Sequence, residues 1–218
     1  MKFIISDIDN VILLTAETVR VTATGMYVID NRISIPPTTT FKIIDYTGEL
    51  PEDFAPRKYC YSEDRGFVIN EKFIRENLAA AINSKVEELD TTCNKTIIAG
   101  ADVTLKSGET LHFTLDEHDQ ANLTAIENKL IRGATLVMWH EDNQDEHCKF
   151  FDAEDGWKII DTLTDFKTYH ITYFRDARIY IRSLTDADVV NSFSYGDEIP
   201  DEYKSDVLKS LEAAMLNT

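Results

Sequence analysis

The feature that most constrains the fold is a helical hydrophobic pattern that continues for about thirty residues without a proline. Apolar residues recur three or four positions apart from Trp157 to Leu184. Asp152 precedes the pattern as a candidate N-cap, with Asp155 at the N3 position of a capping box. At ~1.5 Å per residue such a helix is roughly 45 Å long, which exceeds the diameter of its own domain. We therefore expect it to contact other chains as well as its own sheet.

The stretch from Ile98 to Asp152 alternates strand and turn patterns around one helical pattern. In ADVTLKSGETLHFTLDE the apolar residues fall at every second position, which is typical of strands with one face in water. Gly108 lies between the two runs and can adopt the positive φ of a tight hairpin. Asp116 is a candidate N-cap for the next helix, and Gly133 occupies a C′ position. A second hairpin, residues 134–151, completes a small sheet with one helix on its face.

Short apolar and alternating runs, separated by turns that contain Asn, Gly or Pro, predict a small antiparallel sheet domain over residues 1–70. From Lys72 to Leu89 the pattern becomes helical, and residues 90–94 are expected to end that helix. Pro200 is expected to open a last helix. The sequence thus predicts an α+β fold. A β-rich antiparallel N-terminal module precedes a C-terminal module, residues 71–218, in which helices pack on a small antiparallel sheet.

Charge and cysteine content narrow the class of protein. Thirty-nine acidic and 22 basic residues give a net charge of −17, which repels nucleic-acid phosphates and anionic lipids. No apolar run reaches the ~18 residues of a membrane span, and the N-terminus has no signal-peptide pattern. We therefore expect neither a nucleic-acid nor a membrane partner. Cys60, Cys93 and Cys148 form no C-x-x-C pair, so we expect reduced buried thiols, with Cys148 inward on its strand.

The stretch FIISDIDNVIL is similar to the first motif of haloacid-dehalogenase-type phosphatases. The resemblance implies Asp7 as the phosphorylated nucleophile and Asp9 as the general acid, with both holding magnesium. Two carboxylates at a strand end can meet one metal and one phosphoryl group. That fold needs alternating strands and helices, however, and the next sixty or so residues contain almost no helical pattern. A turn between two strands is therefore the favoured interpretation.

A group of potential metal ligands occurs at the tip of the second hairpin. It comprises His140, Glu141, Asp142, Asp145, Glu146, His147 and Cys148. The spacing of the two histidines and the cysteine matches no standard structural zinc site, and the acidic residues lack the Gly and terminal Glu of an EF-hand loop. We therefore expect a solvated tip without a metal. His170 falls on the inner stripe of the long helix, where a hydrogen-bonded core residue is expected.

Two groups of aromatic residues are candidates for protein contact. Tyr59, Tyr61 and Phe67 can form a binding face on a predicted hairpin, although cross-strand aromatics also form packing surfaces. Tyr169, Tyr173 and Tyr180 add an amphipathic stripe beside the apolar face of the long helix. Tyrosines supply contact area with a polar end, so this stripe indicates an interface.

Several stretches from about Leu50 onward resemble small phage and prophage proteins. PEDFAPRKYCYSEDRGFVIN is similar to a segment in which an acidic loop leads to a hairpin, and IIAGADVTLKSGETLHFTLDEHDQANL to the unit that follows it. CKFFDAEDGWKII, FKTYHITYF and YGDEIPDEY match the rest of the pattern in order. Arg65 and Val68 depart from it, since less basic and more aromatic residues are expected there. This departure argues against a ligand-binding role of the hairpin.

Such proteins are encoded among tail and tail-fibre genes, and the resemblance transfers no catalytic residue. It implies a non-enzymatic structural or adaptor protein of a bacteriophage tail or baseplate, made in the host bacterial cytoplasm and carried in the virion. We expect it to bind other tail proteins and itself, with a trimer favoured, and to need no cofactor. One alternative is a fibre-assembly chaperone that is absent from the virion. The other is a phosphatase that uses Asp7 and Asp9.

Overall fold

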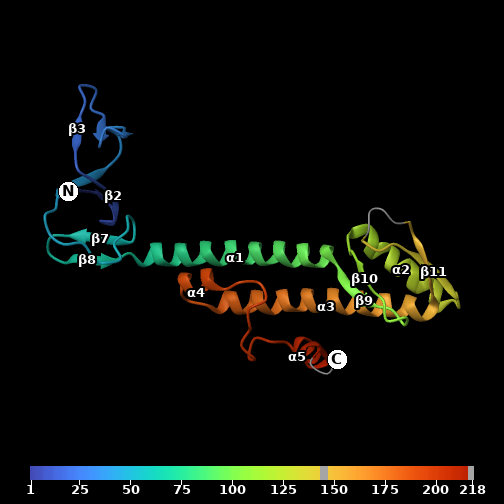
Figure 1. Cartoon of the computed structure of the whole chain (residues 1–218). Coiled ribbons are helices and arrows are strands. Elements are labelled where there is room, and N and C mark those ends of the chain that lie inside the picture. The colour runs from blue at the N-terminus through green and yellow to red at the C-terminus, as the bar shows by residue number, and fades with distance from the viewer. Residues whose placement is uncertain (143–146, 216–218) are drawn as a thin grey trace. The chain divides into compact units, whose positions relative to one another are not determined.

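The computed structural model describes residues 1–142 and 147–215 (Figure 1). The predicted α+β class is confirmed, since helices, among them one long helix, accompany several small antiparallel sheets. The chain divides into two compact units, Met1–Ala80 and Ala81–Thr218, which meet inside helix α1 (Glu71–Ala99). The boundary predicted near residue 70 lies where α1 begins. Within the described ranges, no helix is both long and apolar enough to cross a membrane.

The first unit is built around a central strand that is buried on both faces. Its main sheet has the order β2-β1-β6, and both pairings are antiparallel. Phe3 and Ile5 of β1 enter one apolar cluster with Tyr59, whereas Ile4 enters a second cluster with Ile29. Because both faces of β1 are covered, its apolar run is continuous instead of alternating. The strands are β1 (Lys2–Ser6), β2 (Ile12–Ala16) and β6 (Phe41–Asp45).

A second sheet and a hairpin complete the first unit, and all their pairings are antiparallel as predicted. The sheet has the order β3-β4-β5. The hairpin β7–β8 is joined to the main sheet by a bridge between Val11 and Cys60. The elements are β3 (Val19–Val21), β4 (Tyr27–Ile29), β5 (Ile33–Ile35), β7 (Tyr59–Ser62) and β8 (Gly66–Ile69).

Helix α1 is longer than the sequence pattern predicted. The predicted end at residues 90–94 is wrong, because the helix continues to Ala99. The hydroxyls of Thr92 and Thr96 each donate to the carbonyl four residues earlier at 2.9 Å, which keeps these residues compatible with a helix. The helix ends at Gly100, which has a φ of +82°. A Cβ there would overlap a backbone carbonyl of the neighbouring hairpin, so the turn requires glycine.

In the second unit, two hairpins and α2 pack on the first half of α3 (Figure 1). Alternate strand residues, among them Val103, Phe113, Val137 and Phe151, enter one core with Leu163 of α3. The two predicted hairpins are confirmed, but they form two separate two-stranded sheets instead of the one small sheet that was predicted. The elements are β9 (Ala101–Thr104), β10 (Thr110–Phe113), α2 (Glu117–Ile131), β11 (Leu136–Trp139), β12 (Lys149–Asp152) and α3 (Ala153–Ser183).

The predicted long helix is confirmed as α3, with Asp152 as its N-cap. The predicted capping box is wrong in one half. The Asp152 carboxylate accepts from two backbone N–H groups of the first turn, but the Asp155 carboxylate accepts from the Lys106 N–H at 2.8 Å. Asp155 thus joins the β9–β10 turn to α3. The complete capping box belongs to α2, where Asp116 and Asp119 bond each other's backbone.

The segment after α3 folds back against that helix and contains α4 (Ala187–Ser192) and α5 (Asp206–Met215). The prediction that Pro200 opens the last helix is wrong, since Pro200 precedes a turn and α5 starts later. The Ser205 hydroxyl accepts from the Leu208 N–H at 3.2 Å and so caps α5. The N–H and the hydroxyl of Ser205 both donate to the buried carboxylate of Asp176, at 2.7 and 2.8 Å. This pair of bonds fastens the C-terminal segment to α3.

Candidate protein-binding surface

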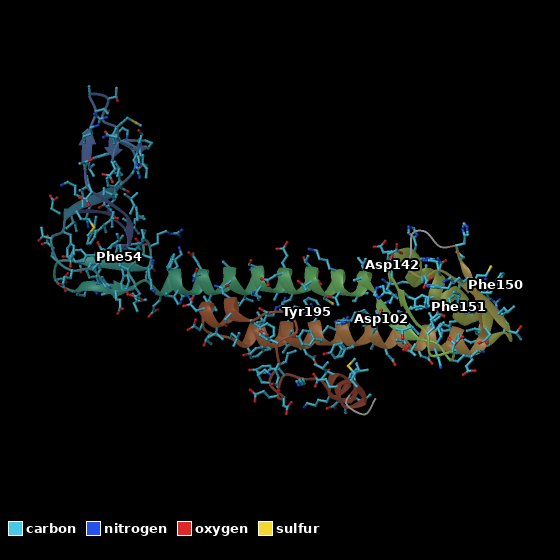
Figure 2. All side chains as sticks on the ribbon, viewed as in Figure 1. Phe54, Asp102, Asp142, Phe150, Phe151 and Tyr195 are labelled. Carbon is cyan, nitrogen blue, oxygen red and sulfur yellow. The ribbon has the colours of Figure 1, made fainter. Side chains whose placement is uncertain are left out.

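The hairpin β11–β12 carries apolar side chains on both of its faces. Its inner residues are buried in the core of the unit: Val137, Trp139 and Phe151. On the outer face, Leu136, Met138 and Phe150 are 57%, 54% and 71% exposed. Met138 lies opposite Phe150 in the ladder, and Figure 2 labels Phe150 beside its buried neighbour Phe151. We call Leu136, Met138 and Phe150 the hairpin face.

The hairpin β9–β10 provides a comparison within the same unit. It has strands of the same length and packs on the same core. Its outer face carries Asp102, Thr104, Thr110 and His112, all of which are exposed. Such polar residues are expected where one side of a strand faces water. The hairpin face departs from this rule, and exposed apolar patches of this kind mark sites of protein contact.

The hairpin face has the chemistry of a contact surface. Fully burying a Leu, Met or Phe side chain contributes roughly 1.5–3 kcal/mol, so covering the exposed parts of all three would contribute about 3–5 kcal/mol. Because β11 and β12 form a two-stranded sheet, each strand has one edge outside that ladder among the described residues. A partner can therefore cover the face or add a strand to an edge.

Two lysines next to the hairpin form ion pairs with acidic residues. Lys149 of β12 forms an ion pair with Glu141, and Lys106 forms one with Asp152. These pairs neutralise charge beside the apolar side chains in a chain with a net charge of −17. The hairpin face is therefore an apolar patch with ion pairs at its border, as in the core and rim of a protein interface.

Tyr59, Tyr61 and Phe67 lie in the apolar core of the first unit. The Phe67 ring centroid is 5.1 Å from that of Tyr61 and 6.0 Å from that of Tyr59, and Phe3 stands against both Tyr61 and Phe67. The Tyr59 hydroxyl donates to Asp53 at 2.5 Å, and this bond raises the pKa of Tyr59. These rings form the packing surface of the β7–β8 hairpin. Their predicted role in binding a partner stays a prediction.

The tyrosine stripe of α3 contacts the chain's own C-terminal segment. Tyr173 is buried, its hydroxyl donates to the Asp197 carbonyl at 2.8 Å, and burial raises its pKa to about 12. Tyr169 stacks beside Tyr173, and the Tyr180 ring lies 5.2 Å from that of Tyr203. Much of the stripe is thus used within one chain. Its predicted contact with other chains stays a prediction.

His170 belongs to a hydrogen-bonded cluster that joins α1, α3 and the C-terminal segment. Its Nδ1 lies 3.0 Å from the hydroxyl of Tyr195, which Figure 2 labels, and the Cys93 thiol donates to the His170 carbonyl at 3.3 Å. The hydrogen-bonded role predicted for His170 is confirmed. Burial lowers the pKa of His170 and raises the pKa of both Cys93 and Tyr195. All three groups are therefore held neutral, which suits packing better than nucleophilic chemistry.

Asp7 and Asp9 lie in the turn between β1 and β2. Lys42 Nζ is 3.9 Å from the Asp7 carboxylate, and Asp9 accepts from the Val11 N–H at 3.3 Å. A hydrogen bond from Ser6 lowers the pKa of Asp9, which keeps it ionised, whereas a general acid must carry a proton. The turn joins antiparallel strands, unlike the parallel alternation that the phosphatase motif requires. The phosphatase remains an alternative to be tested.

Only part of the acidic tip of the second hairpin is described. Asp145 and Glu146 lie outside the described residues. His140 Nε2 is 3.1 Å from the buried carboxylate of Asp119. Cys148 is exposed, so its predicted inward position is wrong, because β12 begins one residue later. Residues 1–142 and 147–215 contain no group of three or more side chains that could hold a metal ion.

Comparison of the chain with family models, curated proteins and solved structures finds no match. No matched protein therefore supplies a function for this chain. The hairpin face was not predicted from the sequence, although the sequence contains a signal for it. Residues 136–139 are all apolar, as are Phe150 and Phe151, so an alternating strand there has apolar side chains on both faces.

Proposed function

We propose that this protein is a non-enzymatic structural or adaptor component of a bacteriophage tail that acts through protein–protein contacts. The hairpin face is the observation that carries the proposal, because three large apolar side chains stand in water where the matching hairpin is polar. The tail context comes from the stretches that resemble phage and prophage tail proteins. The partners proposed are other tail proteins and further copies of this chain.

Burial of the hairpin face alone does not supply the free energy of a micromolar complex, so other residues must add to the interface. A dissociation constant of 1 μM corresponds to about 8 kcal/mol, and the face supplies about 3–5 kcal/mol before the costs of association. It would thus form the apolar centre of a larger interface. Phe150, the most exposed of the three, is the residue expected to dominate.

The test compares phage particles that carry Phe150→Asp with particles that carry Thr110→Asp on the polar hairpin. Purified particles are analysed by mass spectrometry, and the copy number of this chain is measured against a major tail protein. We expect wild-type copy number for Thr110→Asp and at least a tenfold loss for Phe150→Asp, which corresponds to about 1.4 kcal/mol. Wild-type levels of the Phe150→Asp chain would contradict the proposal.

The same preparations separate the two alternatives. A chain that is abundant in infected cells but missing from wild-type particles would be an assembly chaperone. Phosphate release in the presence of magnesium, lost in Asp7→Asn, would identify the phosphatase.

A further inference from the structure

The second half of α3 carries a cluster of arginines on an acidic unit. Arg175, Arg178 and Arg182 recur three and four positions apart, so they share one side of the helix. Residues 81–218 contain 27 acidic and 13 basic residues. None of the three arginines forms an ion pair with any described residue of the chain. We call them the arginine face.

Two details indicate that the arginine face is more than a response to the helix dipole. A cation in the last turn of a helix is favoured electrostatically, which accounts for Arg182 but not for Arg175 and Arg178. The guanidinium of Arg178 lies over the Phe174 ring at 5.6 Å, and its Nε is buried without a hydrogen-bond partner among the described residues. Stacking on Phe174 thus fixes the Arg178 side chain against the helix, while Arg175 and Arg182 are exposed and can bind a carboxylate.

An acidic surface lies on the opposite side of the same helix. Tyr173, Asp176 and Tyr180 hold the segment 197–206 through the contacts with Asp197, Ser205 and Tyr203. At about 100° per residue, this side of α3 is roughly 160° from the arginine face. The segment exposes several carboxylates: Asp197, Glu198, Asp201, Glu202 and Asp206. We call residues 197–206 the acidic segment, and within one copy it cannot reach the arginine face.

We propose that the arginine face of one copy docks on the acidic segment of a second copy. A second copy is the proposed partner because the two surfaces have opposite charges. Each chain carries both surfaces, but they lie on opposite sides of α3 and cannot meet within one copy. Because the two surfaces differ, the contact between copies is head-to-tail. Repeated contacts of this kind close into a ring, such as a trimer, when the rotation between successive copies allows it. The proposal rests on the self-association included in the proposed function. It depends neither on the hairpin face nor on the tail context.

The test is a charge reversal and its rescue, with molar mass measured by size-exclusion chromatography and light scattering. The first variant combines Arg175→Glu with Arg182→Glu, and the second combines Glu198→Lys with Glu202→Lys; all four residues are exposed. A third carries all four substitutions, which restores complementarity with opposite signs. We expect the wild-type protein to have a molar mass that is a multiple of the 24.9 kDa mass of one chain. Each two-site variant should associate on the order of 100-fold more weakly, and the four-site variant should regain the wild-type mass.

A matched control reverses two exposed lysines elsewhere, Lys95→Glu with Lys129→Glu, and should keep the wild-type mass although its net charge changes equally. Circular dichroism checks the helix content of each variant, and Arg175→Ala with Arg182→Ala replaces a reversed variant that does not fold. Wild type at the mass of one chain at every concentration would overturn the proposal. So would a folded four-site variant that stays a monomer, or an arginine variant that keeps the wild-type mass. None of these results alters the particle analysis that tests the tail assignment.

Discussion

Replacing Asp176 by alanine should release the C-terminal segment from α3 without unfolding the unit. Asp176 is 4% exposed and accepts two hydrogen bonds from Ser205, at 2.7 and 2.8 Å. A hydrogen bond to a charged group contributes roughly 1.5–3 kcal/mol, and the variant loses two such bonds. Part of this loss is offset, because the variant no longer buries a carboxylate. We therefore expect a net loss of about 3 kcal/mol. This is below the roughly 5–15 kcal/mol that holds a domain folded, so the core around Leu163 should survive.

The assay is hydrogen exchange of backbone amides, which reports local opening. A loss of about 3 kcal/mol should speed exchange in α5 on the order of 100-fold, while amides around Leu163 keep their wild-type rates. Asp165→Ala changes an exposed aspartate on the same helix and should leave α5 unaffected. Equal exchange of α5 in Asp176→Ala and in wild type would refute the argument that the two Ser205 bonds hold the segment.

Three further predictions concern the second unit. Gly100→Ala should lower the free energy of unfolding in urea by more than ~2 kcal/mol, because φ is +82° and a Cβ would overlap a carbonyl; a smaller change would count against this. His112 bonds two acceptors, the Asp102 carboxylate and a carbonyl at the end of α1, and both raise its pKa. Its contribution to stability is thus complete below the unfolded value of about 6.5 and is lost as the pH rises through the folded pKa. NMR titration should give a higher pKa for His112 in the wild-type protein than in the Asp102→Asn variant. Equal pKa values would contradict the hydrogen bond between His112 and Asp102. Iodoacetamide should alkylate exposed Cys148 well before buried Cys93, whose pKa is raised by burial. Equal rates of alkylation would show that α3 and the C-terminal segment do not cover Cys93.

Periodicity predicted the parts of the fold in which a single local pattern dominates. The α3 helix from Ala153 to Ser183 has a continuous apolar stripe and an N-cap, and both are visible in the sequence. The end of α1 was harder to predict, because threonines occur in both helices and turns, and the bonds of Thr92 and Thr96 to the preceding turn are seen only in the structure. Gly100 marks the true end, and its need for glycine comes from a hairpin that folds against it.

The candidate site was less predictable because it depends on what remains uncovered. Tyr173 looks like an interface residue in the sequence, yet it bonds Asp197, which is 24 residues away and belongs to a segment without a strong pattern. Phe150 looks like a core residue, yet it is 71% exposed because the hairpin has no second layer on its outer face among the described residues. Pattern analysis identifies apolar faces. It does not identify which of them the chain itself buries.

Site-specific crosslinking in infected cells tests directly whether the hairpin face binds a tail protein. A photoreactive benzoylphenylalanine is placed at Phe150 on the hairpin face or at Thr104 on the polar hairpin, and crosslinked proteins are identified by mass spectrometry. We expect crosslinks from position 150 to a tail protein and few from position 104. Crosslinks from position 104 alone, or none from position 150 in cells that assemble complete tails, would contradict it.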